Sequence, residues 1–114
     1  MFASVTTVRG SGPDAGETAR MAGESMASWL RDFDGYRGIV ILADPQSYLI
    51  RIVTLWDSLE AIERSEQSRT QVRESMVATA DASIESVERA AVVFQDLVEP
   101  GPQADPGPGP EPAG

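Results

Sequence analysis

The chain has 114 residues, of which eighteen are acidic and nine are basic, giving a net charge of −9. This length suits a single domain, and the acidic balance argues against nucleic acid or an anionic membrane as a partner. Cysteine, histidine, lysine and asparagine are absent, which removes disulfides, the usual metal and haem ligands, the usual general base and Schiff-base chemistry. No segment reads as a signal peptide or a membrane span, so we expect a cytoplasmic protein.

The N-terminal third predicts a strand followed by an amphipathic helix. Residues 2–9 mix threonine, valine and phenylalanine in loose alternation, as in a strand covered on one face. A helix of about 20 residues should begin at Asp14, because Glu17 stands three residues later in a capping-box pattern. Its apolar positions recur every three or four residues and are better explained by core contact than by a cofactor site. They are Ala19, Ala22, Met26, Trp29, Leu30 and Phe33.

A β-hairpin is predicted in the middle of the chain. Gly35 should end the first helix, since glycine adopts the left-handed conformation found there. Residues 39–43 and 48–56 then read as two strands, joined by the turn Asp-Pro-Gln-Ser at 44–47. The strand at 48–56 ends in Trp56.

Both predicted hairpin strands are apolar on both sides of the pleat, which indicates that both faces are covered. The helices can cover one face, and a second copy of the sheet would cover the other. We therefore predict a homodimer through sheet faces that carry Val40, Leu42, Leu49 and Val53, or through the opposite faces. Arg51 interrupts the apolar run, and it either pairs with an acid at the subunit interface or lines a cavity.

The second helical region is predicted to span residues 58–80. Asp57 and Glu60 have the spacing of a capping box, which explains these acids better than a catalytic pair does. Residues 65–70 contain no apolar side chain, so we expect a break or kink there, where a ligand cavity could open. The apolar positions that can share a buried side are Leu59, Ile62, Val72, Met76 and Ala80.

A last strand is predicted over residues 84–94, and from residue 99 proline and glycine dominate. We therefore expect a folded domain over residues 1–98 and a flexible acidic tail over 99–114. The order strand, helix, strand, strand, helix, strand predicts an α+β fold of the ferredoxin-like βαββαβ type. Its four-stranded antiparallel sheet would carry both helices on one face.

Two motifs give this order a family resemblance. The pattern G-x-x-G-I-V-I-L-x-D-P from Gly35, and the D-S-L-E-A-x-x-x-S-E that follows Trp56, resemble the antibiotic biosynthesis monooxygenase superfamily of dimeric α+β barrels. The resemblance covers about residues 3–96. It implies a homodimer in which two sheets face each other.

The same resemblance suggests an oxidoreductase, a monooxygenase that acts on a small aromatic substrate without metal or flavin. Trp56 matches the tryptophan that such enzymes use, although it could instead pack the hairpin onto the second helix. The other pocket candidates are Tyr36, Tyr48, Arg51 and Trp29, with Arg37 beside them.

The missing residue types limit what carries over. Asparagine and histidine, which family enzymes also use, are absent, and the haem-degrading members need a histidine. The sequence predicts no cofactor and no metal site, since it contains no phosphate-binding loop, dinucleotide fingerprint or metal-ligand cluster. Two alternatives stay open, namely a small-molecule-binding module without catalysis and a purely structural dimerisation domain.

Overall fold

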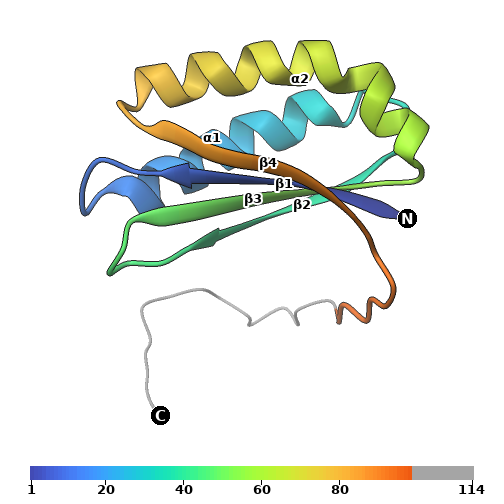
Figure 1. Cartoon of the computed structure of the whole chain (residues 1–114), viewed down its shortest axis with the longest axis horizontal. Coiled ribbons are helices and arrows are strands. Elements are labelled where there is room, and N and C mark those ends of the chain that lie inside the picture. The colour runs from blue at the N-terminus through green and yellow to red at the C-terminus, as the bar shows by residue number, and fades with distance from the viewer. Residues whose placement is uncertain (99–114) are drawn as a thin grey trace.

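A computed structural model describes residues 1–98 of the chain. The predicted element order is confirmed, and the two helices lie side by side over one face of a four-stranded sheet (Figure 1). The predicted tail at 99–114 lies outside the described residues. The elements are β1 (Phe2–Arg9), α1 (Ala15–Leu30), β2 (Tyr36–Ala43), β3 (Leu49–Trp56), α2 (Leu59–Thr79) and β4 (Ser83–Ala91).

The sheet has the strand order β2-β3-β1-β4, and every neighbouring pair is antiparallel. The register places Val8 opposite Ile50 and Thr6 opposite Ile52, and all four side chains lie on the side of the helices. The ferredoxin-like arrangement predicted from the sequence is therefore correct for the single chain. This arrangement encloses a core between one sheet face and two helices.

Helix α1 is shorter than predicted, with 16 residues instead of about 20. Asp14 occupies the predicted N-cap position but makes no side-chain capping bond, and Glu17 bonds to Arg20 instead. The helix ends at Leu30 with Arg31 as its C-cap, so the prediction that Gly35 ends it is wrong; Gly35 lies in the turn after the helix with φ +86°, a conformation that glycine adopts without strain. This glycine lets the chain turn into β2.

Helix α2 differs from its prediction at two places. Ser58, not Asp57, is the N-cap, because its Oγ accepts a hydrogen bond from the Ala61 amide at 3.1 Å. The helix also continues through residues 65–70, so the expected break or kink takes the form of a bend only. Figure 1 shows its first turns inclined to the remainder, near Ser65, whose hydroxyl bonds back to the Ala61 carbonyl at 3.0 Å. Such back-bonding often bends a helix without breaking it.

The predicted set of buried apolar residues on α2 is partly wrong. Ile62 is fully buried, but Leu59 is 38% exposed, and the residues that continue the buried side are polar. They are Ser65, Arg69 and Arg73, spaced by four residues. The helix therefore persists where the apolar pattern stops because buried polar groups replace apolar ones on the same face.

Strand β4 ends three residues before its predicted end at 94. The Val92 amide still donates to the Met1 carbonyl at 2.9 Å, but the neighbouring strand β1 begins at Phe2 and offers no partner beyond it. Val93 and Phe94 consequently lie exposed outside the sheet. No helix within residues 1–98 is long and apolar enough to cross a membrane.

Candidate functional site

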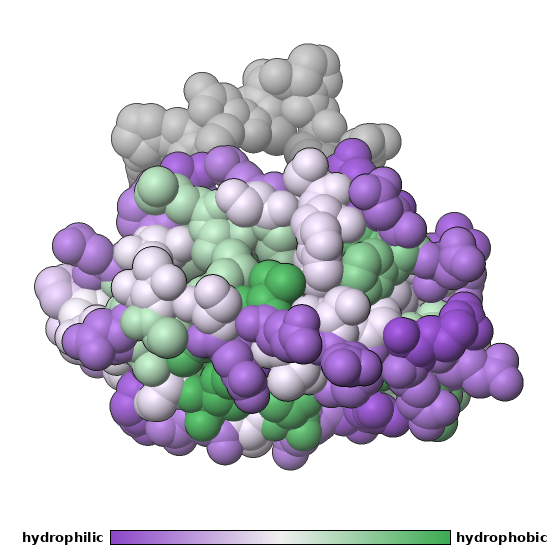
Figure 2. Space-filling model, turned by 90° about the horizontal axis from the view of Figure 1, so that it is seen from above, coloured by the Kyte–Doolittle hydropathy of each residue, from purple (hydrophilic) through white to green (hydrophobic). Residues whose placement is uncertain are grey.

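A cavity of about 210 Å³ lies between the helices and the sheet, at the end where β1 stops and α1 starts. Its walls are mostly apolar and come from four elements. Small alanines on α1 and at the end of α2 leave the space that larger side chains would fill. The apolar wall consists of Val8, Ile50, Ile52, Ala19, Ala22, Met26, Met76, Val77 and Ala80. From the helical side, apolar side chains (green) are visible between charged ones (purple) in Figure 2.

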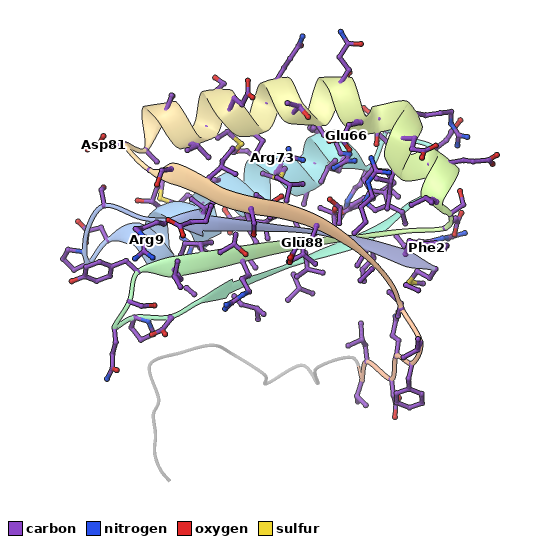
Figure 3. All side chains as sticks on the ribbon, in the orientation of Figure 1. Phe2, Arg9, Glu66, Arg73, Asp81 and Glu88 are labelled. Atoms are coloured by element: carbon purple, nitrogen blue, oxygen red, sulfur yellow. The ribbon has the colours of Figure 1, made fainter. Side chains whose placement is uncertain are left out.

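Few polar groups reach this cavity. Ser11, Asp14 and Thr18 line it from the β1–α1 loop and the start of α1, and all three are exposed. Arg73 lines it from α2 and is only 9% exposed. Figure 3 shows Arg73 extending from α2 into the space between the helices and the sheet. The cavity thus combines an apolar wall with one buried cation.

A second cavity of about 30 Å³ lies beside the first and shares Met26, Ile52 and Arg73 with it. Its wall also contains the hydroxyls of Thr6 and Thr54, which are both buried. A space of this size can hold one water molecule or a diatomic molecule. Arg73 stands where the two cavities meet.

Arg69 lies one turn before Arg73 and is also buried. Its guanidinium donates to Ser65 Oγ at 2.8 Å, to the Ile62 carbonyl at 3.0 Å and to Glu66 Oε1 at 3.0 Å. It also lies 5.0 Å from the centre of the Trp56 ring, within cation–π range. Burial lowers the pKa of Arg69; Glu66 opposes this shift, and nearby arginines add to it. Arg69 is therefore held by partners within the protein.

Trp56 is fully buried and lines neither cavity. Its Nε1 donates to Thr54 Oγ1 at 2.9 Å, and Tyr36 packs edge-on against its ring at 5.7 Å. Thr54 lines the smaller cavity, so Trp56 reaches that space through one hydroxyl. Its predicted catalytic role stays a prediction, and the contacts assign it packing and the orientation of Thr54.

The other predicted pocket residues are dispersed in the fold. Trp29 lines the smaller cavity, whereas Tyr36 belongs to the aromatic cluster around Trp56, where burial raises its pKa. Tyr48 lies at the hairpin turn, where its carbonyl accepts from the Gly10 amide at 2.8 Å. Arg51 is exposed on the sheet face opposite the helices. The structure does not gather these residues into one site, and their roles in binding stay predictions.

Arg37 faces away from both cavities and forms a two-bond ion pair with Asp57, in which Nη2 donates to Oδ2 at 3.1 Å. Sequence reasoning missed Arg69 and Arg73, because arginine on a helix normally reads as a solvent-exposed residue. The signal was their spacing, which continues the buried side of Ile62 and Ser65. Within residues 1–98, no group of three acidic side chains is arranged to hold a metal ion.

Comparison with known proteins supports the fold. No protein-family model and no curated protein sequence matches the chain. A monooxygenase from Streptomyces coelicolor, solved with nanaomycin D, superposes with a TM-score of 0.61 at 15% identity, covering 88% of this chain and 92% of that one. A proposed antibiotic biosynthesis monooxygenase from Deinococcus radiodurans gives 0.59 at 19% identity, covering 89% and 99%. A similar protein from Chloroflexus aurantiacus gives 0.58 at 16%, covering 86% and 98%.

These matches confirm the fold resemblance predicted from the hairpin motifs. The chain has the α+β fold of structures assigned to antibiotic biosynthesis monooxygenases. At identities below 20%, these matches establish a shared fold and no shared activity.

Proposed function

We propose that the chain is a monooxygenase that binds a small aromatic molecule in the larger cavity and oxidises it without a cofactor. The cavity of about 210 Å³ carries this proposal. It is smaller than the roughly 300–1,000 Å³ typical of sites for drug-sized ligands, so a compact ligand fits best. Its apolar wall suits aromatic rings, and its buried cation suits an oxygen atom on them. The fold shared with a monooxygenase that holds nanaomycin D supports the same conclusion.

The electrons for such a reaction come from the substrate. An anthrone-type ring carries a CH₂ group that loses a proton to give an enolate, and this anion reduces dioxygen. One oxygen atom becomes the new ring carbonyl, and the other leaves as water with the two hydrogens of that carbon. The residues around the cavity would bind the ring, exclude water and hold the charged oxygen.

Oxygen uptake with anthrone in the presence of a chelator tests the activity. We expect uptake above the spontaneous rate and a quinone product in equal amount to the oxygen consumed. Ala22→Leu, which narrows the cavity, should reduce this uptake at least about tenfold, as a loss of 1.4 kcal/mol in binding would. Anthrone binding with no uptake above the spontaneous rate would refute catalysis and leave a binding protein.

A binding module without catalysis is the second candidate. The observation that favours it is the burial of Trp56 away from the larger cavity. Its indole N–H already donates to Thr54, so it has no donor left for a ligand. Asp14 is the one acidic side chain among the residues that line this cavity, and it is exposed at the edge. Anthrone affinity in the absence of turnover separates this candidate from the enzyme.

We also propose that the active form is a homodimer joined through the sheet face opposite the helices. Val40 and Leu42 on this face are 42% and 53% exposed, and the register places them beside Val53 and Arg51 of β3. Glu88 of β4 lies on the same face, two strands from Arg51. A two-fold axis through this face would cover the apolar residues and allow Arg51 to pair with a partner's acid.

Val40→Arg tests the dimer without disturbing the core of one chain, because the residue is already partly exposed. We expect the variant to sediment as a monomer at micromolar concentration while the wild type sediments as a dimer, and to lose the concentration dependence of its melting temperature. Glu74→Arg on the exposed side of α2 is the matched control and should leave the dimer intact. A folded wild-type monomer at these concentrations would refute the proposal.

A further inference from the structure

We infer that Arg73 binds an ionised oxygen of the ligand, so that the cavity takes the phenolate or enolate form of an aromatic molecule in preference to the neutral form. This inference rests on the proposed binding of an aromatic molecule in the same cavity. It adds a substrate class, namely phenols and enols that ionise at an oxygen attached to the aromatic ring. It also adds a residue that selects them.

The first observation is that Arg73 is buried without a partner. The residue is 9% exposed, yet within residues 1–98 no hydrogen bond or ion pair involves its guanidinium. A guanidinium has five N–H donors and a permanent charge, and burial of an unpaired charge is costly. Arg69, one turn away on the same helix, has three acceptors of its own. The contrast indicates that Arg73 is left for an acceptor that the chain does not supply.

The second observation is that the Arg73 guanidinium lies at the junction of the two cavities. Arg73 lines both cavities, together with Met26 and Ile52, and Figure 3 shows it between α2 and the sheet. A ring system that enters the larger cavity against the apolar wall would bring its inner edge to this point. An oxygen at that edge can accept one or two of the guanidinium N–H bonds in a low-dielectric setting, where charge-assisted bonds are strong.

The charged groups around Arg73 favour an anion over a cation or a neutral group. From α2, Arg69 adds a second buried positive charge, which Glu66 partly balances. From β4, Arg89 bonds to the same Glu66 at 3.4 Å. From the start of α1, Asp14 lies exposed at the edge. Strands β1 and β3 contribute no charged side chain to either cavity wall.

This arrangement gives a route to substrate ionisation without a general base. The acidic C–H or O–H of the ligand releases its proton to water, and the buried cation stabilises the oxyanion that remains. The ion pair forms only with the ionised ligand, so binding favours ionisation. Proton and charge balance, because the proton enters solvent and the negative charge stays on the ligand oxygen.

The test uses 2-hydroxyanthraquinone, whose phenolate is coloured, and its methyl ether, which cannot ionise. Both are titrated into the full-length wild-type protein across a pH series, and absorbance reports the ionisation of the bound phenol. We expect the pKa of the bound phenol to fall by at least about one unit from its value in water, which equals a tenfold preference for the anion. The ether should bind at least about tenfold more weakly than the phenolate.

Arg73→Met removes the charge and keeps most of the side-chain length. We expect the variant to bind the phenolate about tenfold to a hundredfold more weakly, the range expected for a charge-assisted bond, and to bind the ether within about threefold of wild type. Arg73→Lys, which keeps the charge, should recover most of the shift in the phenol. Arg64→Met removes a cation from the exposed side of the same helix and should change neither ligand.

The possible outcomes distinguish the role of Arg73, the aromatic site and the monooxygenase activity. Binding of both ligands with an unshifted phenol pKa in wild type would refute the role of Arg73 and leave the aromatic site standing. Failure of both ligands to bind would refute the site and the inference together. A shifted pKa without oxygen uptake would support Arg73 and refute only the monooxygenase activity. Because the wild-type titration stands alone, poor folding of Arg73→Met would not remove the test.

Discussion

The helical layer packs differently at its two ends over the same sheet face. At the end where β3 stops, Trp56, Leu30 and Ile62 are almost completely buried and form the core cluster, with aromatic rings around it. At the opposite end, Ala19 and Ala22 face a cavity. The backbone layers are continuous from one end to the other (Figure 1), so side-chain volume decides where the interior is solid and where it is open.

The difference follows the sequence of α1. Small residues occupy the inward side of its first three turns, whereas Met26, Trp29 and Leu30 occupy the last turns. One amphipathic helix therefore closes one end of the fold and opens the other. With the proposed function, stability depends on the aromatic end and ligand binding on the alanine end, so changes at each end should separate the two properties.

Trp56→Ala should produce the largest loss of stability, because it leaves a cavity in the core cluster at the aromatic end of the fold. The ring is fully buried, contacts Tyr36 and Arg69, and donates a hydrogen bond to Thr54. Removal of a buried aromatic side chain costs about 3–5 kcal/mol. Urea unfolding monitored by circular dichroism measures it.

Trp56→Phe keeps most of the volume and is the matched control for that variant. We expect it to retain most of the stability, since volume-conserving changes usually cost less than about 1.5 kcal/mol. Its oxygen uptake with anthrone also tests the predicted role of Trp56. A fall in turnover of the folded Trp56→Phe variant at unchanged anthrone affinity would show that the indole acts in catalysis, against the packing role that its contacts support.

Arg69→Met acts at the border between the two ends. The variant loses three hydrogen bonds and the contact with the Trp56 ring, and we expect a loss of about 1.5–3 kcal/mol, the range for a hydrogen bond to a charged group. The loss is limited because Glu66 keeps Arg89 as a partner. Thermal unfolding measures it, and an Arg69→Met variant more stable than wild type would show that burial of this charge costs more than its bonds return.

The sequence predicted the fold for identifiable reasons. Turn residues between two short apolar runs marked the hairpin, and the spacing of Ala22, Met26 and Leu30 marked the inward side of α1, as the structure confirms. Local capping was less predictable, since Asp57 and Ser58 both suit an N-cap and only the hydrogen bond to Ala61 distinguishes them.

The place of the larger cavity and the burial of the arginines were not predicted: the pattern suggested an opening at residues 65–70, whereas the larger cavity lies beside Arg73, Met76 and Ala80. Residues 65–70 lack apolar side chains, so the pattern predicted a break or kink, whereas Ser65 and Arg69 are buried and bonded along a helix that bends but is not interrupted. Partners for these groups come from carbonyls and from a ring far away in sequence, such as Trp56. Burial of arginine depends on such tertiary contacts, so the four-residue spacing of Ser65, Arg69 and Arg73 indicates it only once these contacts are known.

Ala22→Leu should fill part of the cavity at the alanine end of α1. The added carbons enter existing space, so we expect the free energy of unfolding to change by less than about 1 kcal/mol or to increase. Affinity for 2-methoxyanthraquinone should fall at least about tenfold, equivalent to 1.4 kcal/mol. Ser25→Leu on the exposed side of α1 is the control. Equal ligand affinity in Ala22→Leu and wild type would place the binding site elsewhere.

Asp57→Asn should change the free energy of unfolding least, because it removes a half-exposed ion pair that belongs to neither the core cluster nor the cavity wall. Arg37 holds the pKa of Asp57 below its usual value, first through their hydrogen bond. A lowered folded pKa stabilises the fold above the unfolded pKa of about 3.9, and this contribution disappears as the pH falls through the folded pKa. Wild type should therefore be slightly more stable than Asp57→Asn at pH 7, and the two should converge in acid. Both side chains are about half exposed, so added salt should shrink the difference at pH 7. Urea unfolding at pH 7 and in acid measures the difference in the free energy of unfolding between the two proteins. A difference that is independent of pH would show that the charge of Asp57 does not stabilise the fold.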